Sequence, residues 1–138
     1  MGSLKEYIMN LESPIVSVPK SSAYLFDALS DIKNFEKLMP ENIAKFEVID
    51  ENCFEFGLKG MPEIKLVKKS AKPTSEIVLG AASSKLPFTL IAKLDEKSAE
   101  ETNVQLHFEG DFNPMMAMMI KGPIGKFIET LAQNMVKL

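Results

Sequence analysis

Few side chains in this 138-residue sequence are suited to acid–base or nucleophilic chemistry. His107 is the only histidine and Cys53 is the only cysteine, so an imidazole base or a thiol nucleophile must be one of these two. His107 alternates with Leu106 and Phe108, which places its ring on the polar side of a predicted strand. Cys53 precedes Phe54 in the same kind of pattern, so we expect it to face outward or toward a loop, with no histidine to activate it. Neither residue predicts a catalytic centre.

Carboxylates are the remaining candidates for acid–base catalysis. Asp111 and Asn113 fall where the last predicted strand leads into the C-terminal helix, and a role as helix N-cap fully explains Asn113. The acidic pairs at 95–96 and 100–101 lie in a turn, where carboxylates are solvated. The paired Cys or His spacing of a zinc site does not occur in this sequence. We therefore predict no catalytic residue, no metal and no cofactor.

The charge pattern narrows the range of partners. The formal net charge is −3, and all sixteen basic residues are lysine. Nucleic-acid binding depends on clustered cations that neutralise phosphates, so we exclude nucleic acid as a partner. The absence of arginine also excludes planar, bidentate clamping of a carboxylate or phosphate. The lysine-rich stretch 65–72 fits a solvated face better than an anion site.

The size and composition are typical of one globular domain, which we place at 1–138. Hydrophobic residues make up 46% of the chain and charged residues 25%. Apolar runs stay below the roughly 18–20 residues of a membrane-spanning helix, and the chain does not open on a secretory leader. A lone cysteine cannot form an intramolecular disulfide. We expect a cytoplasmic protein that does not insert into a membrane.

The N-terminal third predicts one strand and two short helices. Apolar residues alternate over 4–18 but are interrupted at Pro14, which indicates an edge strand with a break. Ser21 can cap a helix whose apolar residues follow at helical spacing. Asp31 can cap a second short helix, which ends at Leu38 before Met39 and a proline.

The middle of the chain predicts an antiparallel meander. From 44 to 112 the apolar residues alternate with polar ones, and turn residues separate the successive runs. One apolar face and one polar face indicate a sheet that is packed on one side only. The six predicted strands cover 45–48, 53–58, 64–69, 76–82, 87–94 and 104–109.

A long C-terminal helix can cover this sheet. Asn113 is a good N-cap, Pro114 suits the first helical position, and apolar residues then recur every three or four positions up to Leu138. Pro123 falls in the middle of this stretch. Because a proline removes a backbone hydrogen bond and clashes with the preceding turn, we expect a kink there.

The order strand, two short helices, six strands and long helix resembles the helix-grip fold of the START/SRPBCC superfamily, which includes polyketide cyclases and birch-pollen-allergen-like proteins. The residues that carry the resemblance are the stretch 16–31, Asn34-Phe35 and Leu38-Met39-Pro40. The resemblance implies an α+β fold in which a curved antiparallel sheet of about seven strands wraps around the C-terminal helix. It also implies a cavity for an apolar ligand between sheet and helix.

Four methionines in the segment 114–120 draw attention to the start of the C-terminal helix. Methionine side chains are unbranched and polarizable, so they can repack around apolar ligands of different shapes. Ordinary core filling is the alternative explanation. The resemblance places this half of the helix at the cavity mouth, and we expect the cavity to be lined by Phe54, Phe56, Leu66, Leu79, Phe88, Leu90, Leu106, Phe108, Met116, Met119, Ile120 and Phe127.

The resemblance therefore implies binding of a small hydrophobic or amphipathic ligand, such as a lipid or a polyketide-like compound. The alternative is an enzyme of the polyketide cyclase or dehydrase type that acts in the same cavity, and a completely packed interior would hold no ligand. A protein-interaction module would show an apolar patch on the outer sheet face. Charged residues dominate that face, with Val67, Val78 and Ile91 as scattered exceptions. Homodimerisation through an edge strand stays open.

Overall fold

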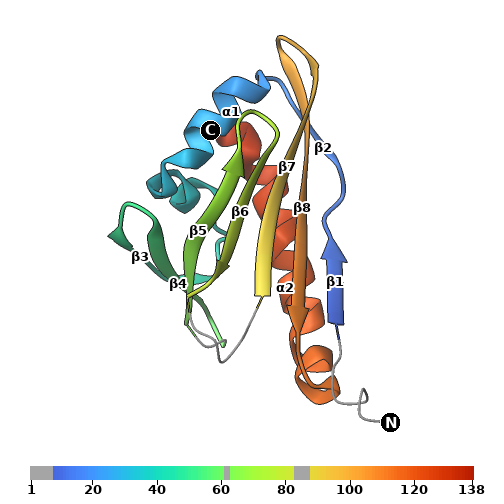
Figure 1. Cartoon of the computed structure of the whole chain (residues 1–138). Coiled ribbons are helices and arrows are strands. Elements are labelled where there is room, and N and C mark those ends of the chain that lie inside the picture. Colours follow the sequence, from blue (N-terminus) through green and yellow to red (C-terminus); the bar gives the residue numbers. More distant parts are fainter. Residues whose placement is uncertain (1–7, 61–62, 83–87) are drawn as a thin grey trace.

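The computed structural model describes residues 8–60, 63–82 and 88–138 and has an α+β architecture. An eight-stranded sheet curves around the long helix α2, and two short helices lie near the C-terminal end of α2 (Figure 1). In chain order the elements are β1 (Ile8–Glu12), β2 (Val16–Val18), α1 (Ser22–Ser30), η2 (Ile32–Leu38), β3 (Ile43–Asp50), β4 (Cys53–Leu58), β5 (Ile64–Lys72), β6 (Glu76–Ala81), β7 (Phe88–Ser98), β8 (Glu101–Asp111), α2 (Pro114–Asn134) and η3 (Met135–Lys137).

The sheet is an antiparallel meander whose first strand crosses over to pair with the last. The strand order is β1-β8-β7-β6-β5-β4-β3, and β2 also pairs with β8. The predicted fold class is confirmed, and the strand number is eight rather than about seven because the N-terminal strand is divided in two. The predicted strand residues at 4–7 and 87 lie outside the described part of the chain.

The division between β1 and β2 falls at Ser13 and Pro14, as the proline predicts. Pro14 has no backbone N–H to give to the sheet. The buried Ser13 continues the hydrogen bonding to β8 between the two strands. Its backbone N–H donates to the Leu106 carbonyl at 2.9 Å, and its Oγ accepts the Leu106 N–H at 2.9 Å. Both strands therefore stay attached to β8.

The three helices that were predicted from the sequence start at their predicted caps. The Ser21 hydroxyl accepts the Tyr24 N–H at 3.1 Å, and the Asp31 carboxylate accepts the Lys33 N–H at 3.2 Å. The Asn113 side chain accepts the Met116 N–H at 2.8 Å, with proline in the first turn of α2. The second helix is a 3₁₀ helix, and α2 continues through Pro123, so the proline does not end it. The expected kink stays a prediction.

The core lies between the concave face of the sheet and the helices. Leu25 and Leu29 of α1 and Leu131 of α2 are fully buried there. Phe54 on β4 is sandwiched between Phe35 of η2 and Phe46 of β3, with ring centroids 5.2 and 5.3 Å apart. These contacts fill one end of the interior completely. The space that is left open lies elsewhere along the sheet.

The two residues with nucleophilic or imidazole chemistry both lie on the outer face of the sheet. His107 is half-buried, with its Nδ1 3.1 Å from a Glu12 carboxylate oxygen and its Nε2 3.2 Å from the Gln105 side-chain oxygen. Cys53 lies on the outer face, as expected from its alternation with Phe54, but it is buried there, with only 7% of its surface exposed. Asp50 and Val67 lie opposite it on the two neighbouring strands, and a short side chain between longer neighbours is shielded from water.

Candidate ligand-binding cavity

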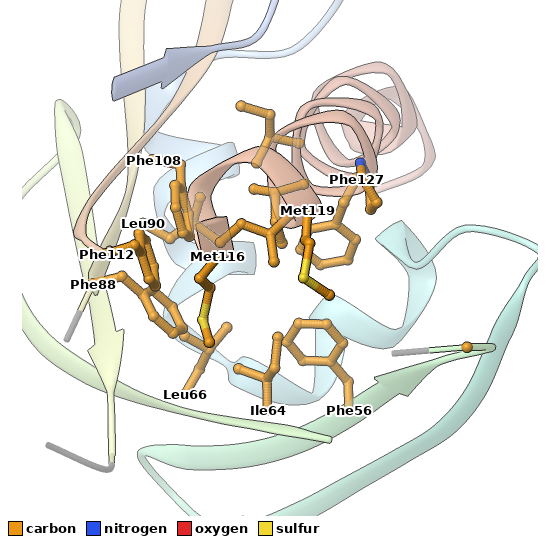
Figure 2. A pocket seen from close by; sticks show the side chains of 15 residues that line it. Phe56, Ile64, Leu66, Phe88, Leu90, Phe108, Phe112, Met116, Met119 and Phe127 are labelled. Atoms are coloured by element: carbon orange, nitrogen blue, oxygen red, sulfur yellow. The ribbon is translucent and has the colours of Figure 1, made fainter. Parts of the chain in front are cut away.

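A cavity of about 360 Å³ lies between the concave face of the sheet and the N-terminal half of α2. Figure 2 shows the side chains arranged around its open centre. All of the described residues that line it are apolar or glycine. They are Phe56, Gly60, Ile64, Leu66, Phe88, Leu90, Phe108, Phe112, Met116, Met119, Ile120, Pro123, Ile124, Phe127 and Ile128.

The sheet contributes one wall through the alternation of its strands. Phe56 on β4 lies directly opposite Ile64 on β5, and Leu90 on β7 lies opposite Phe108 on β8. Residues opposite each other in a ladder point to the same face of the sheet, which here is the concave one. Leu66 follows Ile64 on the same face of β5. The sheet wall thus spans β4, β5, β7 and β8.

Helix α2 contributes the other wall through residues three and four positions apart. Met116, Ile120 and Ile124 lie on one stripe of the helix, and Met119 lies beside them. Figure 2 shows the Met116 and Met119 side chains directed into the open space. Met119 is nevertheless 70% exposed, whereas Ile124 is buried. Met119 therefore lies at the mouth of the cavity and Ile124 in its interior.

Two groups of stacked rings stand on opposite sides of the cavity (Figure 2). On one side Phe108 stacks with Phe88 at 5.1 Å and with Phe112 at 6.1 Å between ring centroids. On the other side Phe56 stacks with Phe127 at 4.9 Å. Stacked aromatic pairs add stability beyond the area they bury, which gives these two sides fixed positions. Among the described residues, no stacked ring pair includes the methionine side of the mouth.

Most of the predicted lining residues lie around this cavity, but three do not. Phe54 is enclosed by other rings at the η2 end, and Leu79 and Leu106 are buried in the packed core. Alternation identifies the inward face of a strand and does not show how far a cavity extends along it. The predicted residues that line the cavity are Phe56, Leu66, Phe88, Leu90, Phe108, Met116, Met119, Ile120 and Phe127.

Sequence analysis missed six of the lining residues. Ile64 continues the inward alternation of Leu66, and Ile124 lies on the apolar stripe of the helix. The apolar periodicity of the sequence therefore marks both residues as inward-facing. Phe112 lies in the short connection between β8 and α2, where no periodicity applies. The remaining residues, Gly60, Pro123 and Ile128, carry no pattern that marks a cavity wall.

The cavity wall offers neither acid–base groups nor metal ligands among the described residues. Asp111 and Asn113 are exposed near the start of α2, and neither side chain lines the cavity. Tyr24 is exposed on α1, where the Lys20 ammonium lies 4.9 Å from its ring centroid. An arrangement of this kind can exclude water from an apolar group.

Comparison with solved structures identifies the fold. Norcoclaurine synthase from Thalictrum flavum, as a point mutant in complex with a transition state analogue, matches with a TM-score of 0.71 and 10% identity over 96% of each chain. A START superfamily protein from Mycobacterium smegmatis matches with a TM-score of 0.70 and 13% identity over 94% of each chain. A protein from Thermobifida fusca, solved by solution NMR, has a TM-score of 0.65 and 14% identity over 94% of each chain.

These matches show that the chain has the START/SRPBCC helix-grip fold. No protein-family model and no curated protein matches the sequence. Within the described ranges, every helix is too short or too polar to cross a bilayer.

Proposed function

We propose that this protein binds a small hydrophobic or amphipathic ligand in the cavity between the sheet and α2. The observation that carries the proposal is a volume of about 360 Å³ whose described lining is apolar throughout. This volume falls at the lower end of the roughly 300–1,000 Å³ of small-molecule sites. Water in such a space finds few hydrogen-bond partners on the walls, so an apolar group displaces it readily. Burial of apolar ligand surface supplies about 25 cal/mol per Å².

The methionines at the mouth support a binding site that adapts to its ligand. Met116 and Met119 line the cavity from a part of α2 that, among the described residues, takes no part in the ring stacking. Their flexible side chains can change rotamer to admit ligands of different width, while the phenylalanines keep the opposite walls in place. The class of ligand proposed is therefore broad, with a lipid or a polyketide-like compound as examples.

A cyclase or dehydrase activity in the same cavity is the alternative. Such an enzyme would place an acid or a base within hydrogen-bond reach of its substrate. The described lining contains neither, which supports binding over catalysis. Confinement of a reactive chain could still promote cyclisation, so a turnover assay with a poly-β-ketone substrate belongs beside the binding assay.

Two experiments test the proposal. Native and denaturing mass spectrometry of freshly purified protein, with an organic extract of the same sample, should show an apolar compound carried only by the native form. Titration with the neutral fluorophore N-phenyl-1-naphthylamine should show saturable binding that Met116→Trp abolishes by filling the cavity.

Met115→Trp is the matched control for the titration, because Met115 is the adjacent residue but is 74% exposed and does not line the cavity. Equal binding by both variants would contradict the site. Absence of any binding to the wild-type protein would contradict the function.

A further inference from the structure

A second depression adjoins the cavity. It lies between the end of β4 and the middle of α2 and has a volume of about 480 Å³. Gly60, Pro123 and Phe127 line both spaces, so the two adjoin there, and Gly60 and Pro123 are exposed at this border. The remaining lining residues of the depression are Pro40, Asn42, Leu58, Lys59, Gly122, Lys126 and Thr130.

The depression differs from the cavity in its chemistry. Two lysines, Lys59 and Lys126, are among its lining residues, and Asn42 and Thr130 add side chains that can donate hydrogen bonds. The described residues that line it include no carboxylate. The described lining of the depression thus carries two cationic residues and no anionic one, and it adjoins a cavity whose described lining is uncharged.

Lys59 and Lys126 also differ from Lys45, whose ammonium group forms ion pairs with neighbouring carboxylates. Lys45 lies 3.0 Å from Glu55 and 3.5 Å from Glu63, and the hydrogen bond and charge of Glu55 raise the pKa of Lys45. By contrast, no carboxylate among the described residues forms an ion pair with Lys59 or Lys126. Both lysines are exposed and are therefore available to an anion from solution.

We infer that the ligand is an anionic amphiphile whose apolar chain fills the cavity and whose carboxylate or phosphate head lies against Lys59 and Lys126. This inference rests on the proposed function. Burial of a charged head in the cavity would be costly, because the described residues of its walls carry no polar side chain to replace the lost hydration. Lysines in the adjoining depression bind the head in a hydrated position while the chain stays buried. Lysine suits this role because it acts as a point charge and does not require a fixed, planar head geometry.

The test compares three compounds that share one alkyl chain length and differ in their head group, at neutral pH and low ionic strength. Dodecanoate, dodecyl phosphate and dodecanol are each used to displace N-phenyl-1-naphthylamine from the wild-type protein. We expect at least one anion to bind about tenfold more tightly than the alcohol, as two solvent-exposed ion pairs allow. The preference should shrink at high salt, because exposed pairs are screened. Because dodecyl phosphate carries up to two negative charges and dodecanoate one, only a gain for dodecyl phosphate more than twice that for dodecanoate, compared as binding free energies, points to a phosphate headgroup, and a smaller difference points to a fatty acid.

Substitutions test whether the preference for anions over the alcohol depends on Lys59 and Lys126. The double variant Lys59→Gln/Lys126→Gln should lose the preference for anions while its affinity for dodecanol is unchanged. The control Lys72→Gln/Lys93→Gln removes the same charge from exposed positions on β5 and β7 and should keep the preference. Equal affinity for alcohol and anions, or a preference that survives in Lys59→Gln/Lys126→Gln, would overturn this inference alone. If the neutral fluorophore itself does not bind to the wild-type protein, the proposed function fails instead.

Discussion

The ring of Phe127 lies on the ring of Phe56 with their centroids 4.9 Å apart and their planes 7° from parallel. Phe56 belongs to β4 and Phe127 to α2, so this pair fastens the helix to the sheet. Phe127 also lies where the apolar cavity and the lysine-lined depression adjoin, since it lines both. The same contact thus holds the fold together and lies at the border between the two parts of the site.

Replacement of Phe127 by leucine should destabilise the protein by about 1–2 kcal/mol, because the stacking interaction is lost while most apolar volume is kept. Urea unfolding should show a lower midpoint with an unchanged m-value. In a double-mutant cycle with Phe56→Leu, the two effects should be coupled by about 0.5–1.5 kcal/mol. Additive effects would mean that the rings contribute only through the area they bury.

Loss of the Ser13 hydroxyl should cost more stability than its small size suggests. In Ser13→Ala, the buried backbone N–H of Leu106 loses the Oγ that accepts it at 2.9 Å. An unsatisfied buried donor costs about 1–3 kcal/mol. Ser17→Ala is the matched control, since its hydroxyl makes only an exposed hydrogen bond to Glu101, and it should change the free energy of unfolding by less than about 0.5 kcal/mol. Equal losses in both variants would show that the break in the N-terminal strand does not depend on Ser13.

The fold could be predicted because its determinants are local in the sequence. Ser21, Asp31 and Asn113 each precede a helix and cap it in the structure, and alternation marked the strands of the meander. The strands predicted at 87–94 and 104–109 are shorter than β7 and β8. Residues 95–98 and 101–103, where β7 ends and β8 begins, do not show the alternation of apolar and polar residues. Pairing between those two strands, rather than side-chain pattern, extends them to Ser98 and Glu101.

The site was less predictable because a cavity depends on where packing stops. Phe54 and Phe56 look equivalent in the sequence, two positions apart on one face of β4. In the structure Phe35 and Phe46 enclose Phe54, whereas Phe56 borders the open space. That difference arises from η2 packing against one end of the sheet. The lysine-lined depression was equally hidden, since Lys59 and Lys126 come together only when β4 and α2 are assembled.

Cys53 should react slowly with thiol reagents in the native protein. Burial raises the pKa of its thiol, and the nearby Asp50 carboxylate raises it further, with Lys65 acting in the opposite direction. A raised pKa leaves less thiolate at a given pH, and only the thiolate attacks the reagent. At pH 8, reaction with 5,5′-dithiobis(2-nitrobenzoate) should be much slower in buffer than in urea, and the native rate should still rise with pH above the range of a free thiol. A native rate equal to that of free cysteine would contradict the burial of this side chain.

A charged substitution at the mouth should show whether Met119 lies at the entrance of the cavity. Met119→Glu places a carboxylate where the cavity meets solvent, and because Met119 is 70% exposed the fold should tolerate it. Binding of N-phenyl-1-naphthylamine should weaken by about tenfold, or about 1.4 kcal/mol, because the apolar contact of Met119 is replaced by a group that must stay hydrated. Met118→Glu adds the same charge one residue earlier, at a side chain that is 82% exposed and does not line the cavity, and its affinity should match that of the wild type.

Equal weakening in both variants would point to a general effect of charge on α2, and unchanged binding in both would place the entrance elsewhere. Unfolding midpoints of the two variants, measured in parallel, distinguish a blocked entrance from a damaged helix.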